Sequence, residues 1–184
     1  GEAVTADITI DLSTQHTSMY ALEDNVSLIK GEIDYYGTLK FSETGSTNRR
    51  ISLEQVSSSA WTIPWDPNAS WDIGLTPYLP LALSIDGGSG SADLDLNQLR
   101  LTAFAIDQGS GSLTLKLPPS TQPYTADIEG GSGSMNVDLP SDGDLTLRLD
   151  GGSGSINIDI PDGTAVQVEI RDAGSGSVNL PAWL

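Results

Sequence analysis

Acidic side chains recur at one position of a repeated pattern, and their spacing makes them the first candidates for a chemical role. Asp86, Asp107, Glu129 and Asp150 each lie two residues before a Gly-Ser-Gly-Ser tetrapeptide. If the repeats stack in register, these carboxylates form a column with a spacing of about 4.8 Å. Several oxygens around one point bind Ca²⁺, and a pair of carboxylates can cleave a glycosidic bond.

A solvated acidic face is the interpretation that we favour for this column. Calcium-binding glycine repeats have a shorter period and an Asp inside the glycine turn, whereas this chain has Ser there. A second outward column, formed by Asp95, Asp138 and Asp159, is interrupted by Lys116. We therefore expect no metal site and no cofactor, and we treat a calcium column as the weaker alternative.

His16 is the single histidine, and the chain has no cysteine. A transition-metal site usually needs several imidazole or thiolate ligands, so this composition argues against one. As a catalytic base, His16 would need a nucleophile and an orienting acid beside it, which the sequence does not identify. Its polar neighbours predict an exposed turn, and we expect no catalytic residue in the chain.

Three tryptophans, Trp61, Trp65 and Trp71, lie in a proline-rich segment. Exposed indole rings could stack on sugars or contact a partner. The alternative is that they pack this segment onto the rest of the protein, which is the more common use of buried aromatic rings.

The overall charge limits the partners of this chain. The 184 residues carry a formal net charge of −17 and contain no cluster of basic residues. Nucleic acid and anionic membrane surfaces are therefore not expected partners. No segment approaches the roughly 20 apolar residues of a membrane-spanning helix. Any membrane attachment is expected to come from a tether outside this sequence.

The Gly-Ser-Gly-Ser tetrapeptide occurs five times, at steps of 21, 22, 21 and 22 residues. Apolar and polar residues alternate on both sides of each copy, as in Leu113–Leu117 and Leu145–Leu149, which predicts strands with one buried face. Proline ends four of these strands. A fixed period of this size indicates stacked units, so we predict an all-β, right-handed β-solenoid with two main strands in each coil of 21–22 residues.

Glycine at the bends is expected to supply positive φ or close approach to the neighbouring coil. The bend glycines are Gly88, Gly90, Gly109, Gly111, Gly131, Gly133, Gly152, Gly154, Gly174 and Gly176. The extra residue in Arg171–Ala173 predicts a β-bulge before the last bend. We expect Trp183 and Leu184 to cover the end of the stack.

The N-terminal part is less regular. Residues 1–80 are predicted to form irregular coils or a capping sheet, followed by a Trp/Pro connection, and residues 81–184 the five regular repeats of the same structural domain. Alternating segments at 4–12, 28–36, 38–41 and 51–56 predict strands. Gly45–Asn48 resembles a degraded copy of the bend.

Residues 28–36, 71–101 and 109–118 resemble the bacterial toast-rack domains. These domains are related to the putative-adhesin β-solenoids of surface proteins and to the C-terminal domain of Lia-type cell-envelope stress regulators. The resemblance covers most of the chain and is specific for the fold rather than for an activity. It implies an extracytoplasmic, membrane-tethered bacterial protein.

We therefore expect a non-catalytic surface domain that serves in adhesion, scaffolding or ligand display. One alternative is a regulatory interaction domain in envelope-stress sensing, and a second is a carbohydrate-active enzyme. The expected partners are a protein or a cell-wall glycan, and a second copy of the chain could bind at one end of the solenoid.

Overall fold

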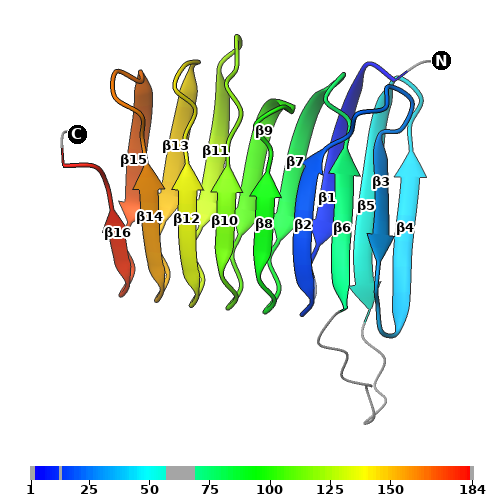
Figure 1. The fold of residues 1–184 in the computed structure, drawn as a ribbon, viewed down its shortest axis with the longest axis horizontal. Coiled ribbons are helices and arrows are strands. Elements are labelled where there is room, and N and C mark those ends of the chain that lie inside the picture. Colours follow the sequence, from blue (N-terminus) through cyan, green and yellow to red (C-terminus); the bar gives the residue numbers. More distant parts are fainter. Residues whose placement is uncertain (1–2, 13, 57–68, 183–184) are drawn as a thin grey trace.

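The protein folds into two β-sheets of eight strands each. In both sheets the strands follow one another along the long axis of the molecule, as the ribbon in Figure 1 shows. This computed structural model describes residues 3–12, 14–56 and 69–182. Strands β15 (Val166–Asp172) and β16 (Ser177–Asn179) lie at one end of the stack, and β3 (Ile29–Ile33) and β4 (Thr38–Thr44) lie at the other. Among the described residues, no helix is long and apolar enough to cross a membrane.

Each sheet takes alternate strands of the chain, apart from the N-terminal ones. We call the sheets A and B. In order of sequence, sheet A contains β1 (Thr5–Asp11), β4 (Thr38–Thr44), β5 (Asn48–Val56), β7 (Pro80–Asp86), β9 (Arg100–Asp107), β11 (Tyr124–Glu129), β13 (Leu145–Asp150) and β15 (Val166–Asp172). Sheet B contains β2 (His16–Ala21), β3 (Ile29–Ile33), β6 (Ser70–Leu75), β8 (Ala92–Asp95), β10 (Leu113–Lys116), β12 (Ser134–Asp138), β14 (Ser155–Asp159) and β16 (Ser177–Asn179).

The five repeats form five coils, each with one strand in either sheet. Every strand from β7 to β16 pairs in parallel with the equivalent strand of the next coil. The register follows the repeat, because Leu113 in β10 pairs with Met135 in β12, and Met135 pairs with Ile156 in β14. The β-solenoid predicted from the period is therefore confirmed.

The space between the sheets is filled by the alternating apolar side chains. Leu115 in β10 and Leu147 in β13 are fully buried, and their polar neighbours in the strands face outward. One hydrophobic cluster runs from Ala6 in the first strand to Ile160 after β14. Burial of a side chain of this size stabilises the fold by about 1.5–3 kcal/mol, so the repeated columns supply most of the favourable free energy.

The N-terminal strands do not stack in the order of the chain. The coil β1/β2 lies between the coil β5/β6 on one side and β7/β8 on the other. Strands β4 and β3 then close this end, and both pair antiparallel to their neighbours, β5 and β6. The N-terminal part is thus two irregular coils plus an antiparallel end layer, which combines the two forms that the sequence left open.

Three expectations about this part were wrong. His16 begins strand β2 and does not lie in a turn. Gly45, with a φ of 85°, lies in the turn between antiparallel strands β4 and β5, so 45–48 is a hairpin turn rather than a copy of the bend. Residues 70–75 form strand β6, which lies between β2 and β3 in sheet B, rather than part of a connection. These segments do not follow the period of 21–22 residues, so that period does not predict their structure.

The predicted bulge in the last coil is confirmed. Leu149 pairs with Ile170 but Asp150 pairs with Asp172, so Arg171 is the additional residue. A second bulge interrupts the pairing of β7 with β9, where Leu81 pairs with Leu101 and Ala82 with Ala103. The hydroxyl of Thr102, the inserted residue, donates a hydrogen bond of 3.0 Å to the carbonyl oxygen of Leu81.

Candidate functional site

The glycines of the bends are required because neighbouring coils touch there. A Cβ atom on Gly111 would collide with the carbonyl oxygen of Gly90, and the same holds for Gly133 against Gly111. Backbone hydrogen bonds join the bends, as from Ser153 N to Gly131 O at 3.0 Å. Of the ten bend glycines, only Gly174 has positive φ. Close approach, rather than backbone conformation, is therefore the reason for glycine at eight of the other positions, namely Gly90, Gly109, Gly111, Gly131, Gly133, Gly152, Gly154 and Gly176.

The four acidic residues singled out in the sequence lie in register at the end of their strands. Asp86 pairs with Asp107, Asp107 with Glu129, and Glu129 with Asp150. We call this row the acidic column. The tertiary structure extends it to seven carboxylates, since Glu54 and Asp11 precede it and Asp172 follows it.

Burial and repulsion within the acidic column both change the pKa of Asp11. Burial raises the pKa of this carboxyl above its ordinary value, and the neighbouring charges of Asp86 and Glu54 raise it further. In the described part of the chain, no group of three or more His, Asp or Glu side chains is arranged to hold a metal ion. The column is thus a row of mutually repelling charges, and each carboxylate faces its neighbours from successive strands.

Basic side chains are mostly engaged with acids. Lys116 interrupts the second acidic column, as expected, and its Nζ lies 4.0 Å from Asp95 Oδ2. Arg148 on the outer face of sheet A bonds Glu169 at 3.2 Å and lies 3.9 Å from Asp127. Seven of the eight Lys and Arg residues form such pairs, namely Lys30, Lys40, Arg49, Arg50, Lys116, Arg148 and Arg171.

His16 lies on the outer face of sheet B beside two residues of β8 and its bend. Its Nδ1 is 2.8 Å from the hydroxyl of Ser91, and its Nε2 is 3.7 Å from Asp93 Oδ2. These are the residue types of a Ser-His-Asp triad, which sequence reasoning could not bring together. The carboxylate is beyond hydrogen-bond distance, however, and the side chains of His16 and Asp93 are 44% and 64% exposed. The His16 ring is therefore exposed, with a hydrogen bond to Ser91 but none to Asp93.

Trp71 is fully buried, so its ring cannot stack on a ligand at the surface. The ring belongs to the inward face of β6, and its Nε1 donates a hydrogen bond of 3.1 Å to the carbonyl oxygen of Asp34. For Trp71, the alternative of packing against the rest of the protein is therefore confirmed and the possible surface contact is excluded, because residues 70–75 form a core strand. Trp61 and Trp65 lie outside the described residues, as do Trp183 and Leu184.

The outer faces of the regular coils carry rows of identical polar side chains. On sheet B, Asn157 donates a hydrogen bond of 3.0 Å to Asn136 and accepts one of 2.7 Å from Asn179. These side chains are exposed and are held at the spacing of the strands. The faces are therefore ordered and polar, and their regularity follows directly from the repeat.

The irregular end of the stack differs, because it contains a hollow. A groove of about 690 Å³ opens where β3 and β4 end the two sheets. We call it the end groove. Its lining combines apolar residues with polar ones, including Phe41, Glu43, Arg49 and Tyr78. Sequence reasoning missed it, since these residues belong to different strands and to a loop, and no repeated pattern connects them.

Comparison with known proteins agrees with this architecture. A crystal structure of a protein from Clostridium sporogenes ATCC 15579, described as a putative cell adhesion protein, superposes with a TM-score of 0.71. The match covers 96% of this chain and 92% of that one, at 19% sequence identity, and it shows a shared β-solenoid fold. No curated protein sequence matches the chain.

The family can be assigned from the sequence model. The model described as "N-terminal domain of toast_rack, DUF2154" matches residues 2–138, which is more than half of the chain. The protein therefore belongs to the toast-rack family. The match begins in the irregular coils and extends through β12, so it includes both the end groove and the first regular repeats.

Proposed function

We propose that this protein is a non-catalytic adhesion domain that acts outside the cytoplasm, at a bacterial cell surface. The observation that carries the proposal is the way in which polar side chains are distributed. They form rows on open sheet faces, as in the asparagine row of sheet B, Asn136, Asn157 and Asn179. Rows of this kind suit repeated contacts with an extended partner, whereas catalysis needs a few groups that converge around a bond.

The fold comparison supports the same proposal. The structural neighbour is described as a putative cell adhesion protein, and both chains match along almost their whole length. An elongated solenoid also has a large surface for its mass, which favours display of binding residues. A protein or a cell-wall glycan is the partner that this function requires.

Adhesion can be tested with beads that carry the purified domain. We expect these beads to be retained on bacterial cells or isolated cell walls more strongly than beads that carry albumin. The same preparation should release no reducing ends from a panel of cell-wall and capsular polysaccharides. Retention equal to that of albumin beads would contradict the adhesive function, and catalytic release of reducing ends would favour an enzyme.

A regulatory interaction domain is the second candidate, and the acidic column is the observation that favours it. Seven carboxylates in register would attract a basic segment of a protein partner. Removing three of the seven charges, with Asp86→Asn, Asp107→Asn and Glu129→Gln together, should then weaken capture of that partner in a pull-down. The adhesive function predicts that bead retention survives this triple substitution.

A further inference from the structure

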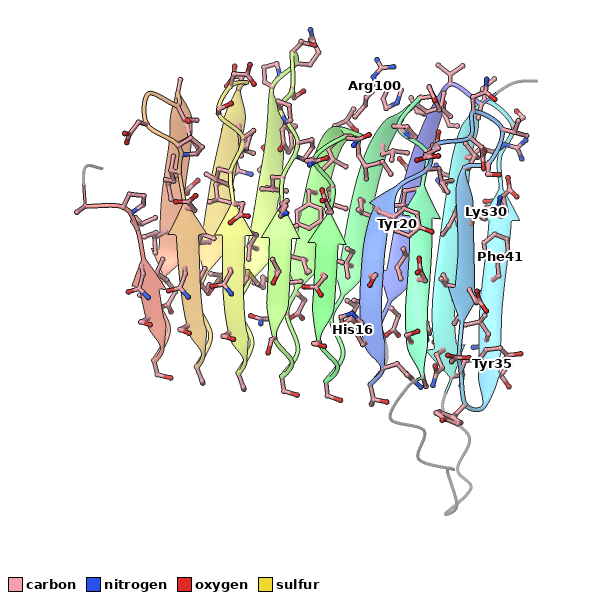
Figure 2. The ribbon with its side chains drawn as sticks, in the orientation of Figure 1. His16, Tyr20, Lys30, Tyr35, Phe41 and Arg100 are labelled. Atoms are coloured by element: carbon pink, nitrogen blue, oxygen red, sulfur yellow. The ribbon has the colours of Figure 1, made fainter. Side chains whose placement is uncertain are left out.

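The end groove has the size and the lining of a ligand site. Its volume of about 690 Å³ lies in the range of small-molecule sites, which are typically 300–1,000 Å³. Phe41 and Tyr78 line it, and they remain 54% and 52% exposed. Figure 2 shows Phe41 on β4, the outermost strand at this end of the stack. The inward face of β4 has no further coil to cover it, which is why an aromatic ring stays accessible there.

An ion pair faces the groove from the same side as Phe41. Glu43 pairs with Ile51 across the β4–β5 ladder, and Phe41 pairs with Leu53. Ile51 and Leu53 are core residues, so residues directly opposite them lie on the inward face. Arg49 Nη1 lies 3.0 Å from Glu43 Oε1. Within the described part of the chain, the Nε of Arg49 is buried and has no hydrogen-bond partner.

A second wall of the groove, formed by Tyr78 and the loop at residues 25–28, is ordered by hydrogen bonds although Tyr78 is exposed. The Tyr78 hydroxyl donates a hydrogen bond of 3.4 Å to the carbonyl oxygen of Glu23, and the Tyr78 carbonyl oxygen accepts one of 3.2 Å from Arg100. Asp24 accepts backbone hydrogen bonds from Val26 and Ser27, at 3.0 and 2.7 Å, and so orders the loop that lines the groove. A wall that is already ordered loses little entropy when it binds a ligand.

We propose that the end groove binds a neutral oligosaccharide. Sugars present apolar C–H faces that pack on aromatic rings, and hydroxyls that bond to carboxylate and guanidinium groups. The groove supplies both kinds of contact through Phe41 and Tyr78 and through the Glu43–Arg49 pair. A ligand hydroxyl can also accept a hydrogen bond from the guanidinium of Arg49, whose side chain is 31% exposed.

The charges in the groove select against an ionic ligand. Glu43 and Arg49 neutralise one another, so the groove adds no net positive charge to a protein whose total is −17. An anionic glycan would be repelled by the surrounding molecule, and a cation would meet the guanidinium of Arg49. A neutral sugar chain satisfies the pair without adding charge. This proposal rests on the adhesive function proposed above, because it names the ligand class and the place where it binds.

The experiment uses the whole chain, labelled and applied to an array of neutral and acidic oligosaccharides. The strongest neutral ligand is then titrated by calorimetry against four variants. Phe41→Ala should weaken binding by about tenfold, in line with the loss of one aromatic contact. Arg49→Lys keeps the charge beside Glu43 but removes the planar guanidinium with its several N–H donors, and it should weaken binding about fivefold.

Two matched variants serve as controls. Tyr35→Ala removes an aromatic ring that is 49% exposed but is not part of the groove lining. Arg50→Lys changes the residue next to Arg49, whose guanidinium instead lies 3.8 Å from Asp7. Both should bind the sugar within about twofold of the unchanged protein. Circular dichroism on all four variants checks that the fold is kept.

The outcomes separate this proposal from the adhesive function itself. Neutral-sugar binding that is unaffected by Phe41→Ala and Arg49→Lys would overturn the groove as the site, and binding of acidic glycans alone would overturn the ligand class. Absence of any sugar binding, with beads still retained on cell walls, would overturn the groove proposal and leave adhesion intact. Loss of bead retention as well would contradict both.

Discussion

The regular coils and the irregular N-terminal end use the same two sheets for different purposes. From β7 to β16, strands pair in parallel with the equivalent strand one repeat away, and the outer faces carry repeated polar rows. At the other end, β3 and β4 pair antiparallel, and Phe41 and Tyr78 remain exposed around a groove. Regular coils therefore extend the stack, whereas the irregular end leaves a groove open to solvent.

The reason for this difference is the identity of the neighbouring strand. A regular coil has a similar coil on each side, so each position is restricted to residues that pack against the equivalent residue of the next coil. The end layer has a neighbour on one side only, and its inward residues are free to vary. Individual shapes and charges can thus be built at the end of a solenoid more easily than in its middle.

Loss of Trp71 should have the largest effect on stability. The ring is fully buried in β6, between β3 and β2, so Trp71→Ala removes packing between the antiparallel end layer and the coils. We expect a loss of about 3–5 kcal/mol in the free energy of unfolding, measured with urea. Phe41→Ala, at the exposed groove, should cost less than about 1 kcal/mol. Equal losses for the two variants would contradict the contrast between core and groove.

Gly131→Val tests the close contact between regular coils. Its side chain would collide with the carbonyl oxygens of Gly109 and Gln108, so we expect a loss of about 1–3 kcal/mol or more. Gly163→Ala is the control, because Gly163 has a φ of 82° but no atom lies within 4 Å of an added Cβ. Conformational strain alone should cost about 1 kcal/mol there. A melting temperature unchanged by Gly131→Val would show that the bends are not in contact.

Two buried glutamines provide a direct comparison between the two regions. In a regular coil, the Gln108 side chain donates hydrogen bonds to the carbonyl oxygens of Gly111 and Ser134, at 3.0 and 3.1 Å. In the irregular coil, Gln15 is 7% exposed, and its amide has no hydrogen-bond partner among the described residues. Gln108→Met should therefore lower stability by about 1–3 kcal/mol.

Gln15→Met should be neutral or stabilising, since it removes an unpaired polar group from the interior. Denaturation by urea compares the two variants directly. A cost for Gln15→Met as large as that for Gln108→Met would show that the Gln15 amide is bonded in solution. The small cavity of about 20 Å³ beside it could then hold the water that makes those bonds.

Removing a charge from the acidic column should have the smallest effect on stability, and it should stabilise the protein rather than destabilise it. Because the pKa of Asp11 is raised in the folded state, its ionisation lowers stability as the pH rises above the ordinary value of 3.8. Asp11→Asn should therefore raise the melting temperature at pH 7 by about 1–2 °C, after allowance for solvent screening. The gain should disappear at pH 3, where the carboxyl is protonated in both states.

Asp7→Asn is the matched control for this charge. Asp7 lies on the same strand and faces Arg50 at 3.8 Å, so its removal should give no gain in melting temperature. A similar rise for Asp7→Asn and Asp11→Asn would mean that the column carries no repulsion of its own and that only the net charge matters.

The sequence predicted the regular coils because each part of their pattern has one structural meaning. Alternation in Leu113–Leu117 indicates a half-buried strand, the following proline ends it, and the constant spacing of the tetrapeptides indicates stacking. The register of Asp86, Asp107, Glu129 and Asp150 follows from that spacing, and the structure shows it. Even the extra residue at Arg171 predicted its bulge.

The irregular end could not be predicted in the same way. Strand β2 contains His16 and several hydroxyl residues, so its composition suggests a turn, and its pairing with β6 and β8 decides otherwise. Trp71 lies among prolines, yet it occupies the core because β6 pairs with β2 and β3. The environment of both residues is decided by pairing with segments that are distant in the chain, and a local sequence pattern does not indicate that pairing.

The amino-acid sequence alone determined that this protein is a stack of parallel coils with glycine bends and acidic faces. The reason is that a constant repeat length fixes which residues of successive coils lie beside one another. The tertiary structure decided the order of the first coils, the extension of the acidic column to Glu54 and Asp11, and the grouping of Phe41, Arg49 and Tyr78 around one groove. These features depend on which strand lies beside which, and that choice is made by the packing of the whole core rather than by any one segment.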